Sequence, residues 1–195
     1  MPWEKNFDIG EALDSAAKVF SIKGFEATSV ADLVKGMGIN RGSLYATFGS
    51  KHSLFQAVLT RFVEQNQALT LARLEAMDDP VAAITTLFDE VLTQSVSNQE
   101  KKGNLVINTA LEFPNHEKDI QNIVTKALRK LEAFFAGRVD AGKATGHISA
   151  KLDTESAAKG LVAMTVGYRV LARGAYDASS LQQVKHTALH LIGLN

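Results

Sequence analysis

The chain has 195 residues, of which 46% are hydrophobic and 22% are charged, a composition that is typical of a folded globular protein and excludes a disordered chain. Twenty-one basic residues balance twenty-one acidic ones, so the net charge favours no class of partner and any electrostatic argument must be local. Cysteine is absent, which excludes disulfides, thiolate metal sites and a cysteine nucleophile.

Apolar residues recur with a helical period along the chain, and neither a period-two alternation nor a hairpin signal interrupts them. We therefore expect an all-α fold of about nine helices. Pro80 and Pro114 fall between the apolar-periodic segments, as expected of residues that end helices. In chain order, the predicted helices cover approximately residues 8–24, 29–36, 40–48, 51–77, 81–97, 102–113, 120–142, 153–175 and 180–192.

Residues that commonly cap helix N-termini stand at the beginnings of these segments. Ser29 and Asp32 have the spacing of a capping box for the second helix. Ser180 and Gln183 have the same kind of spacing for the last helix. Asp8 and Glu11 form a capping-box-like pair at the first helix. Single capping residues are predicted for three further helices: Asn40, Ser50 and Asp153.

The second and third predicted helices are joined by the short turn Met37-Gly38-Ile39, which gives this region the form of a helix-turn-helix. Glycine suits a turn that requires a positive φ angle, and we expect Ile39 to fill the small core between the two helices. The spacing alone is weak evidence for DNA binding, because many all-α proteins contain tight helical corners.

Local charge strengthens the case for a nucleic-acid partner. Residues 33–63 carry a net charge of +4 and no acidic residue, although the whole chain is neutral, and DNA binding depends on neutralising phosphates. The alternative is a solvated helix beside an incidental gap in the acidic residues. The four cations of this window are Lys35, Arg41, Lys51 and Arg61.

The third predicted helix is too polar to be a core helix. Leu44 and Phe48 are expected to point inward. Arginine can read guanine and asparagine can read adenine through paired hydrogen bonds, while hydroxyl groups commonly bind phosphate. The residues expected to face outward are Asn40, Arg41, Ser43, Tyr45 and Thr47.

An ordered set of residues resembles the DNA-binding signature of the TetR (tetracycline-repressor) family. The resemblance covers roughly residues 8–60 and implies a helix-turn-helix DNA-binding domain at 1–50 and a ligand-binding and dimerisation domain at 51–195. The segments that carry it are Ala27-Thr28-Ser29-Val30, Gly38-Ile39-Asn40-Arg41-Gly42-Ser43-Leu44-Tyr45, Phe48-Gly49-Ser50-Lys51 and Leu54-Phe55.

The resemblance implies a ligand-responsive transcriptional regulator, of the repressor type, that is not an enzyme. Its implied partners are double-stranded operator DNA of pseudo-palindromic sequence, a second copy of the chain and an unidentified small-molecule effector that releases the DNA. No cofactor and no metal are expected. The alternatives from other classes are an all-α homodimeric adaptor and a small all-α enzyme, although the chain lacks a convergent nucleophile–base set.

The resemblance also implies individual DNA contacts. Arg41 lies where the family's recognition helix reaches base edges, and Lys51 matches a lysine that holds phosphate. Ala46 and Thr47 replace two bulky residues that many relatives carry after the tyrosine, so Arg41 is expected to carry a larger share of the readout. The predicted DNA-binding residues are Thr28, Ser29, Asn40, Arg41, Gly42, Ser43, Tyr45, Thr47 and Lys51.

Residues 103–112 resemble a segment from one group of the family, in which a cysteine often follows the glycine. Asn104 follows Gly103 here, so sensing through a thiol is not expected. For the aromatic residues of the second half, a solid core is the alternative to a ligand cavity, and for Glu112 the alternative is a surface carboxylate. The predicted ligand pocket comprises Phe88, Leu92, Asn108, Glu112, Phe113 and Phe134.

Gly160 and Gly167 lie seven residues apart on the eighth predicted helix, and glycines on one stripe suggest a close approach there. The resemblance independently implies dimerisation through the last two helices. The alternative is that the glycines only admit a helix of the same chain. The predicted dimer interface comprises Gly160, Met164, Gly167, Leu171, Val184 and Leu189.

His186 and His190 have the i, i+4 spacing of two metal ligands, but no third ligand is evident near them, and we expect them to lie at the surface. No run of apolar residues approaches the roughly 20 that a membrane-spanning helix needs, and the first residues show no signal-peptide pattern. We therefore expect a cytoplasmic location and no membrane partner.

Overall fold

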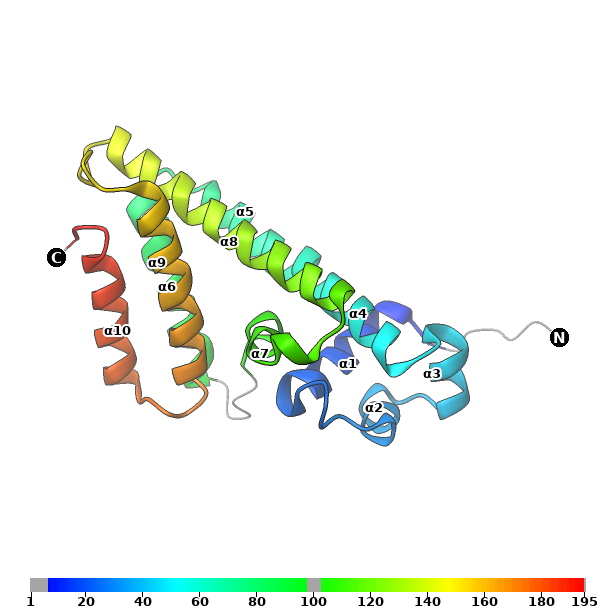
Figure 1. Ribbon diagram of the computed structural model, residues 1–195. Helices are drawn as coiled ribbons and strands as arrows, with labels where there is room; N and C mark the ends of the chain where they lie inside the picture. The colour runs from blue at the N-terminus through cyan, green and yellow to red at the C-terminus, as the bar shows by residue number, and fades with distance from the viewer. Residues whose placement is uncertain (1–6, 98–102, 195) are drawn as a thin grey trace. The chain divides into compact units, whose positions relative to one another are not determined.

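The computed structural model describes residues 7–97 and 103–194, and all the regular structure in these ranges is helical. The all-α prediction is therefore confirmed. The chain divides into two compact units, of which the first comprises residues 1–66 and 104–124 and the second residues 67–103 and 125–195. Figure 1 labels the helices of both units.

The first unit is built from four consecutive helices and a later segment of the chain. In this unit α1 packs against α2, α4 and α7, and α3 packs against both α2 and α4. Its elements are α1 (Ile9–Lys23), α2 (Val30–Met37), α3 (Arg41–Phe48), α4 (Lys51–Phe62), α7 (Leu105–Leu111), a 3-10 turn (Phe113–Asn115) and the beginning of α8 (Lys118–Ala144).

Aromatic residues fill the centre of the first unit. Phe20 and Phe55 are almost completely buried, and their ring centroids lie 4.8 Å apart in an edge-to-face arrangement. Gly24 ends α1 with a φ of 78°, and its N–H donates to the carbonyl of Phe20. Because glycine adopts this positive φ without steric cost, the chain can leave α1 and approach α2 through a short loop.

The predicted helix over residues 51–77 is one helical run that contains an irregularity. It begins as α4, continues through a π-helical segment at Val63–Gln67, and ends as α5 (Ala68–Glu75). Counted as one run, these elements bring the described helices to the expected nine. Within the second unit, Gln67 donates through Nε2 to the carbonyl of Ala127 at 2.8 Å.

The second unit comprises the later helices. In it, α10 packs against α6 and α9, and α5 packs against α6, an arrangement that can be followed in Figure 1. Phe88, Phe135 and Tyr168 are almost completely buried and form its aromatic core. Besides α5 and most of α8, its elements are α6 (Pro80–Ser97), α9 (Thr154–Leu171) and α10 (Ala178–His190).

Several predicted helix boundaries differ from the observed ones, and two of them are instructive. The last helix was expected to begin with Ser180 as its cap, but the carboxylate of Asp177 accepts the N–H of Ser180 at 2.8 Å and α10 begins at Ala178. Both residues are good capping types, and the earlier one is used. The eighth predicted helix was extended to Ala175, whereas α9 ends at Leu171.

The compact units do not divide at residue 50. Helix α4 and residues 104–124 pack with the three N-terminal helices in the first unit, so the division into functional domains at residue 50 stays a prediction. Within the described ranges, no helix combines the length and the apolar character that a bilayer-spanning segment requires.

Candidate nucleic-acid interface

The predicted helix-turn-helix is present in the first unit. Helix α2 ends at Met37, Gly38 adopts the left-handed conformation with φ 67° and ψ 23°, and α3 begins at Arg41. Ile39 is 9% exposed, as expected of a residue that fills the core between the helices. Asn40 caps α3, because its Oδ1 accepts the N–H of Ser43 at 2.8 Å.

One polar face of α3 is open to solvent. Leu44 is buried, as predicted. Ser43 was expected to face outward, but it is also buried, because it occupies the position beside Leu44 on the inner side of a helix only two turns long. Its contact with DNA stays a prediction. Thr47 is half-buried, and the exposed residues of this face are Asn40, Arg41, Gly42, Tyr45 and Ala46.

Arg41 and Tyr45 are neighbours on this face. The guanidinium carbon of Arg41 lies 5.6 Å from the centroid of the Tyr45 ring, which is within the range of a cation–π interaction. At an exposed site such a contact contributes about 0.5–1 kcal/mol, enough to bias the orientation of the guanidinium without fixing it. The donors of Arg41 therefore remain available at the surface of α3.

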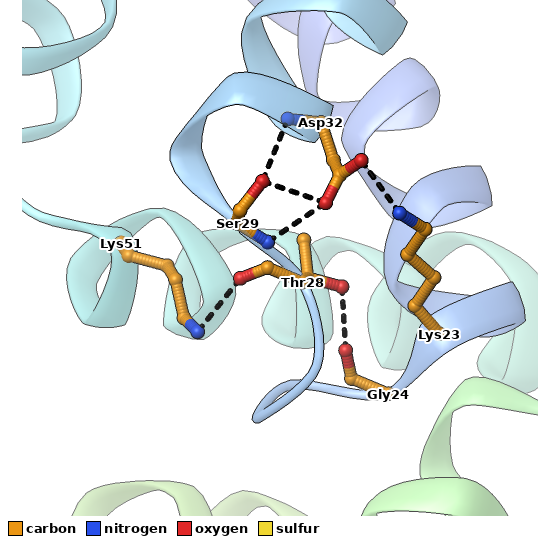
Figure 2. A network of polar contacts seen from close by, with 6 residues as sticks. All are labelled: Lys23, Gly24, Thr28, Ser29, Asp32 and Lys51. Carbon is orange, nitrogen blue, oxygen red and sulfur yellow. Dashed lines mark hydrogen bonds and ion pairs between the residues drawn. The ribbon is translucent and has the colours of Figure 1, made fainter.

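The beginning of α2 is held by a complete capping box, as predicted. Ser29 Oγ accepts the N–H of Asp32 at 3.1 Å, and Asp32 Oδ2 accepts the N–H of Ser29 at 3.0 Å. Lys23 donates to the other carboxylate oxygen, and Figure 2 shows the whole network. The hydrogen bonds from Lys23 and Ser29 hold the pKa of Asp32 well below its usual range.

Thr28 and Lys51 are used inside the unit. Thr28 is 1% exposed, and its Oγ1 donates to the carbonyl of Gly24 at 2.6 Å. Lys51 Nζ donates to the carbonyl of Thr28 at 2.8 Å (Figure 2) and to that of Phe25 at 2.7 Å. The ammonium also lies 4.3 Å from the centroid of the Phe25 ring. The phosphate contacts predicted for Thr28 and Lys51 stay predictions.

The structure gives Lys51 a role that the sequence analysis missed. A single ammonium group on α4 holds the loop between α1 and α2, because its hydrogen-bond acceptors are main-chain carbonyls of that loop. These carbonyls lie more than 20 positions earlier in the chain. No local pattern in the sequence signals such a contact.

Fewer of the positive charges between residues 33 and 63 are free to contact DNA than the sequence suggests. Arg61 pairs with Asp14 on α1 through two hydrogen bonds, Nε to Oδ1 at 2.9 Å and Nη2 to Oδ2 at 3.1 Å. The hydrogen bond from Arg61 lowers the pKa of Asp14. Lys51 and Arg61 are half-buried and used within the unit. Of the four cations between residues 33 and 63, Lys35 and Arg41 are the two that are exposed on the described surface.

The six residues of the predicted ligand pocket belong to different units. Phe88, Leu92 and Phe134 lie in the second unit, where the two phenylalanines are at most 1% exposed. Three others lie in the first unit. There the side-chain amide of Asn108 donates to the carbonyl of Ser21, the carboxylate of Glu112 lies against Gly24, and Phe113 is half-buried. The pocket stays a prediction.

Asn104, which stands where one group of the family often has a cysteine, has a structural role. Its Oδ1 accepts the N–H of Ile107 at 3.2 Å and caps α7. In the second unit, the hydroxyl of Tyr168 is buried without a hydrogen-bond partner among the described residues, and burial raises its pKa to about 12. No feature of the sequence singled out Tyr168, because a tyrosine on an apolar helical face is typical of a core residue.

The two glycines of the predicted dimer interface have different surroundings. A Cβ on Gly160 would lie 2.5 Å from Cδ2 of Leu191 in the same chain, whereas among the described residues no atom from another part of the chain would lie within 4 Å of a Cβ on Gly167. Gly160 thus leaves room for Leu191, which follows α10 in the same chain. This favours the alternative that the glycine admits a segment of its own chain. The other four predicted residues are half-buried and pack on the core of the second unit: Met164, Leu171, Val184 and Leu189.

Comparison with known families gives two matches that together cover most of the chain. Residues 12–58 match the model described as bacterial regulatory proteins, tetR family. Residues 80–188 match the model described as tetracyclin repressor-like, C-terminal domain. The first match contains all of the helix-turn-helix, and the second includes α6 and α9.

Two curated relatives span nearly the whole chain. The HTH-type transcriptional repressor ComR of Escherichia coli K12 is 32% identical over 192 residues, which cover 96% of this chain and 90% of that protein. The HTH-type transcriptional regulator YezE of Bacillus subtilis is 30% identical over 190 residues, 96% of this chain and 97% of that protein.

A solved structure with DNA is also similar. It contains a cysteine mutant of the TetR family transcriptional regulator CifR complexed with 26-bp double-strand operator DNA. Its TM-score is 0.83 at 27% sequence identity, and the match covers 96% of this chain and 98% of that chain. The reduced form of NemR from E. coli has the same fold, with a TM-score of 0.84 at 18% identity.

Proposed function

The chain belongs to the TetR family of bacterial regulatory proteins and is a DNA-binding transcriptional regulator, and we propose that it represses transcription by binding a pseudo-palindromic operator as a homodimer. The family and the named relatives are regulators, which disfavours the alternatives of an enzyme and of an adaptor without DNA. A small-molecule effector releases the operator in this proposal.

The exposed face of α3 is the observation that carries the proposal. Arg41 stands in the first turn of α3 with its guanidinium at the surface, where a helix that enters the major groove places its readers. A guanidinium can donate two hydrogen bonds to O6 and N7 of one guanine. Asn40 uses Oδ1 for its cap, so its side-chain NH2 group is the part that can donate to a base or phosphate.

Phosphate contacts come from the same short segment. The N–H groups in the first turn of α3 follow an exposed cap, and Gly42 adds no side chain that would keep the DNA backbone away. Free N–H groups at a helix N-terminus bind phosphate. Tyr45 contributes an exposed hydroxyl of a type that commonly contacts the DNA backbone.

A homodimer supplies the symmetry of the proposed operator. A two-fold dimer presents two copies of α3, and both enter major grooves when they lie about 34–36 Å apart, or a multiple of that distance. We place the dimer interface on α9 and α10. Gly167 supports this placement, because a Cβ there would meet no described atom from outside its own turn of α9 within 4 Å.

The effector is proposed to bind in the C-terminal part of the chain. The hydroxyl of Tyr168 has no partner in the part of the chain that the structure describes. This supports a ligand with a hydrogen-bond acceptor, because a buried donor without a partner costs about 1–3 kcal/mol. Effector and operator must then weaken each other's binding by the same factor.

An electrophoretic mobility shift on the DNA upstream of the protein's own gene tests the proposal. We expect a complex that survives an excess of unrelated DNA and that weakens steeply with salt. Binding that shows no preference for the upstream DNA over unrelated DNA of the same length would contradict a specific repressor. A chain that binds no DNA and remains a dimer would instead favour the adaptor.

A further inference from the structure

Three side chains of the first unit converge on one point at the surface. His52, in the first turn of α4, hydrogen-bonds through Nε2 with Oδ2 of Asp119 at 2.9 Å. Its Nδ1 lies 3.8 Å from Oε1 of Glu117. One ligand atom from each of these residues lies within 4.8 Å of both others. The two carboxylates stand at the beginning of α8. Asp119 lies 67 positions after His52 in the chain.

The separations suit a metal ion. Bonds of about 2.1 Å to a metal set neighbouring ligand atoms about 3.0 Å apart in an octahedral site and about 3.4 Å apart in a tetrahedral one. The 2.9 Å between His52 and Asp119 already matches the shorter edge. One ion bonds a single imidazole nitrogen, and Glu117 faces Nδ1 whereas Asp119 faces Nε2. Glu117 is 78% exposed, so its side chain is free to turn toward the Nε2 side and join Asp119 on the same ion.

The local structure holds two of the ligands in position. Asp119 Oδ1 accepts the N–H of Ile120 at 2.8 Å, which leaves Oδ2 for the histidine. The imidazole of His52 stands edge-on to the ring of Phe25, with centroids 6.3 Å apart.

The ligand types indicate the class of ion. Mg²⁺ and Ca²⁺ prefer sites made only of oxygen atoms. An imidazole beside two carboxylates suits Zn²⁺, Mn²⁺, Fe²⁺ or Ni²⁺, with water completing the coordination. Partial exposure of His52 and Asp119, at 27% and 36% of their side chains, gives an ion direct access from solvent.

We propose that His52, Glu117 and Asp119 form a binding site for one divalent transition-metal ion on each chain. The ion would connect the beginning of α4 to the beginning of α8. His52 follows Lys51, which holds the loop before α2, so the site lies beside the support of the helix-turn-helix. An effect of the metal on operator affinity rests on the proposed DNA binding, whereas the site itself does not.

Metal ligands bind in their deprotonated form, so metal binding to the site should strengthen as pH rises.

The direct test is metal binding to the full-length, tag-free protein without DNA. After dialysis against a chelator, Zn²⁺ and Mn²⁺ are titrated by calorimetry, and bound metal is counted by elemental analysis. We expect one ion per chain, bound more tightly at pH 8 than at pH 6. His52→Ala and Asp119→Asn should each weaken binding at least tenfold while the circular dichroism spectrum stays unchanged.

His186→Ala is the matched control, since His186 and His190 are exposed on α10 with the spacing of two ligands. This variant should bind the metal as the parent does. The proposal is overturned if the parent binds no metal, if His52→Ala and Asp119→Asn bind as the parent does, or if binding is lost with His186→Ala. Should His52→Ala unfold the chain, Asp119→Asn and Glu117→Gln give the decision.

Discussion

Lys51 Nζ donates a hydrogen bond of 2.8 Å to the carbonyl oxygen of Thr28, 23 positions earlier in the chain. The same ammonium bonds the carbonyl of Phe25 at 2.7 Å and lies over its ring. Helix α4 thereby fixes the loop from which α2 begins, and α2 packs on α3. The position of α3 therefore depends on a lysine that the family resemblance assigned to phosphate.

Replacing Lys51 by methionine should destabilise the protein. Hydrogen bonds that involve a charged group contribute about 1.5–3 kcal/mol each when they are removed one at a time, and two carbonyls would lose their donor. We expect the free energy of unfolding in urea to fall by about 2 kcal/mol. Operator affinity should fall as well, because the loop before α2 is no longer held.

Lys35→Met is the control for that experiment, because Lys35 is an exposed cation of the same charge window. It should leave stability nearly unchanged and reduce DNA binding only through the lost charge. If Lys51→Met weakens DNA binding while stability equals that of the parent, Lys51 acts mainly on phosphate, and the structural role given to it here is wrong.

Asn40 offers a way to separate capping from DNA contact. Its Oδ1 caps α3, and losing a cap costs about 0.5–2 kcal/mol. Asn40→Ala should therefore lower the free energy of unfolding, whereas Asn40→Ser should retain most of it, since serine is a good cap. Both variants lack the amide.

If the amide contacts DNA, both Asn40 variants should lose operator affinity to a similar extent, measured by fluorescence anisotropy. An Asn40→Ser variant that binds the operator like the parent would show that Asn40 serves only as the cap.

His116 should make stability depend on pH. Its side chain is 2% exposed, and it stacks on Phe55 with ring centroids 5.7 Å apart. Burial lowers its pKa below the ordinary value of 6.5, against the opposing charges of Glu112 and Glu26 and together with the charge of His52. The unfolded chain then binds a proton that the folded chain does not.

Stability must accordingly fall as pH drops below about 6.5 toward the lower pKa of the folded state. His116→Phe keeps an aromatic ring between its neighbours and removes the titration. Urea unfolding between pH 5 and pH 7.5 should show a shallower dependence for this variant than for the parent. Parallel curves for the two proteins would mean that His116 gains a partner when it is protonated.

Contacts within one helical turn were predictable from sequence, and contacts between distant segments were not. Ser29, Asn40, Ser50 and Asp153 cap the helices for which they were predicted, because a cap needs only its own chain three residues later. The turn at Gly38 is local in the same way.

The other predictions concerned residues whose environment is set by distant segments of the chain. Arg61 contributed to the predicted basic surface, yet Asp14, 47 positions away, pairs with it. The π-helical segment at Val63–Gln67 interrupts a run whose apolar pattern continues on both sides, so periodicity alone could not locate it. For the predicted pocket, six plausible residues were chosen by type, although they belong to two compact units.

The two glycines of α9 give unequal tests of the predicted dimer interface. A leucine at Gly160 would displace the exposed side-chain end of Leu191 in its own chain, so Gly160→Leu changes a contact within the chain as well as any contact with a partner. Gly167 has open space around it, so Gly167→Leu should leave the monomer folded and act only on a partner. Sedimentation should then show monomers with parental helical content.

Gly167→Ala is the conservative control and should remain dimeric if the interface tolerates one methyl group. A Gly167→Leu variant that sediments as a dimer would move the interface away from this face of α9.

The most direct test of the account is the selection of bound sequences from a random pool of double-stranded DNA, performed with the parent and with Arg41→Ala. We predict a two-fold symmetric consensus whose half-sites are about 10 bp apart, or a multiple of that spacing. Arg41→Ala should relax one symmetry-related pair of positions, at a cost of about 1–3 kcal/mol for each lost bidentate contact. A consensus without internal symmetry, or one that Arg41→Ala leaves unchanged, would contradict the claim that α3 reads the operator in a two-fold dimer.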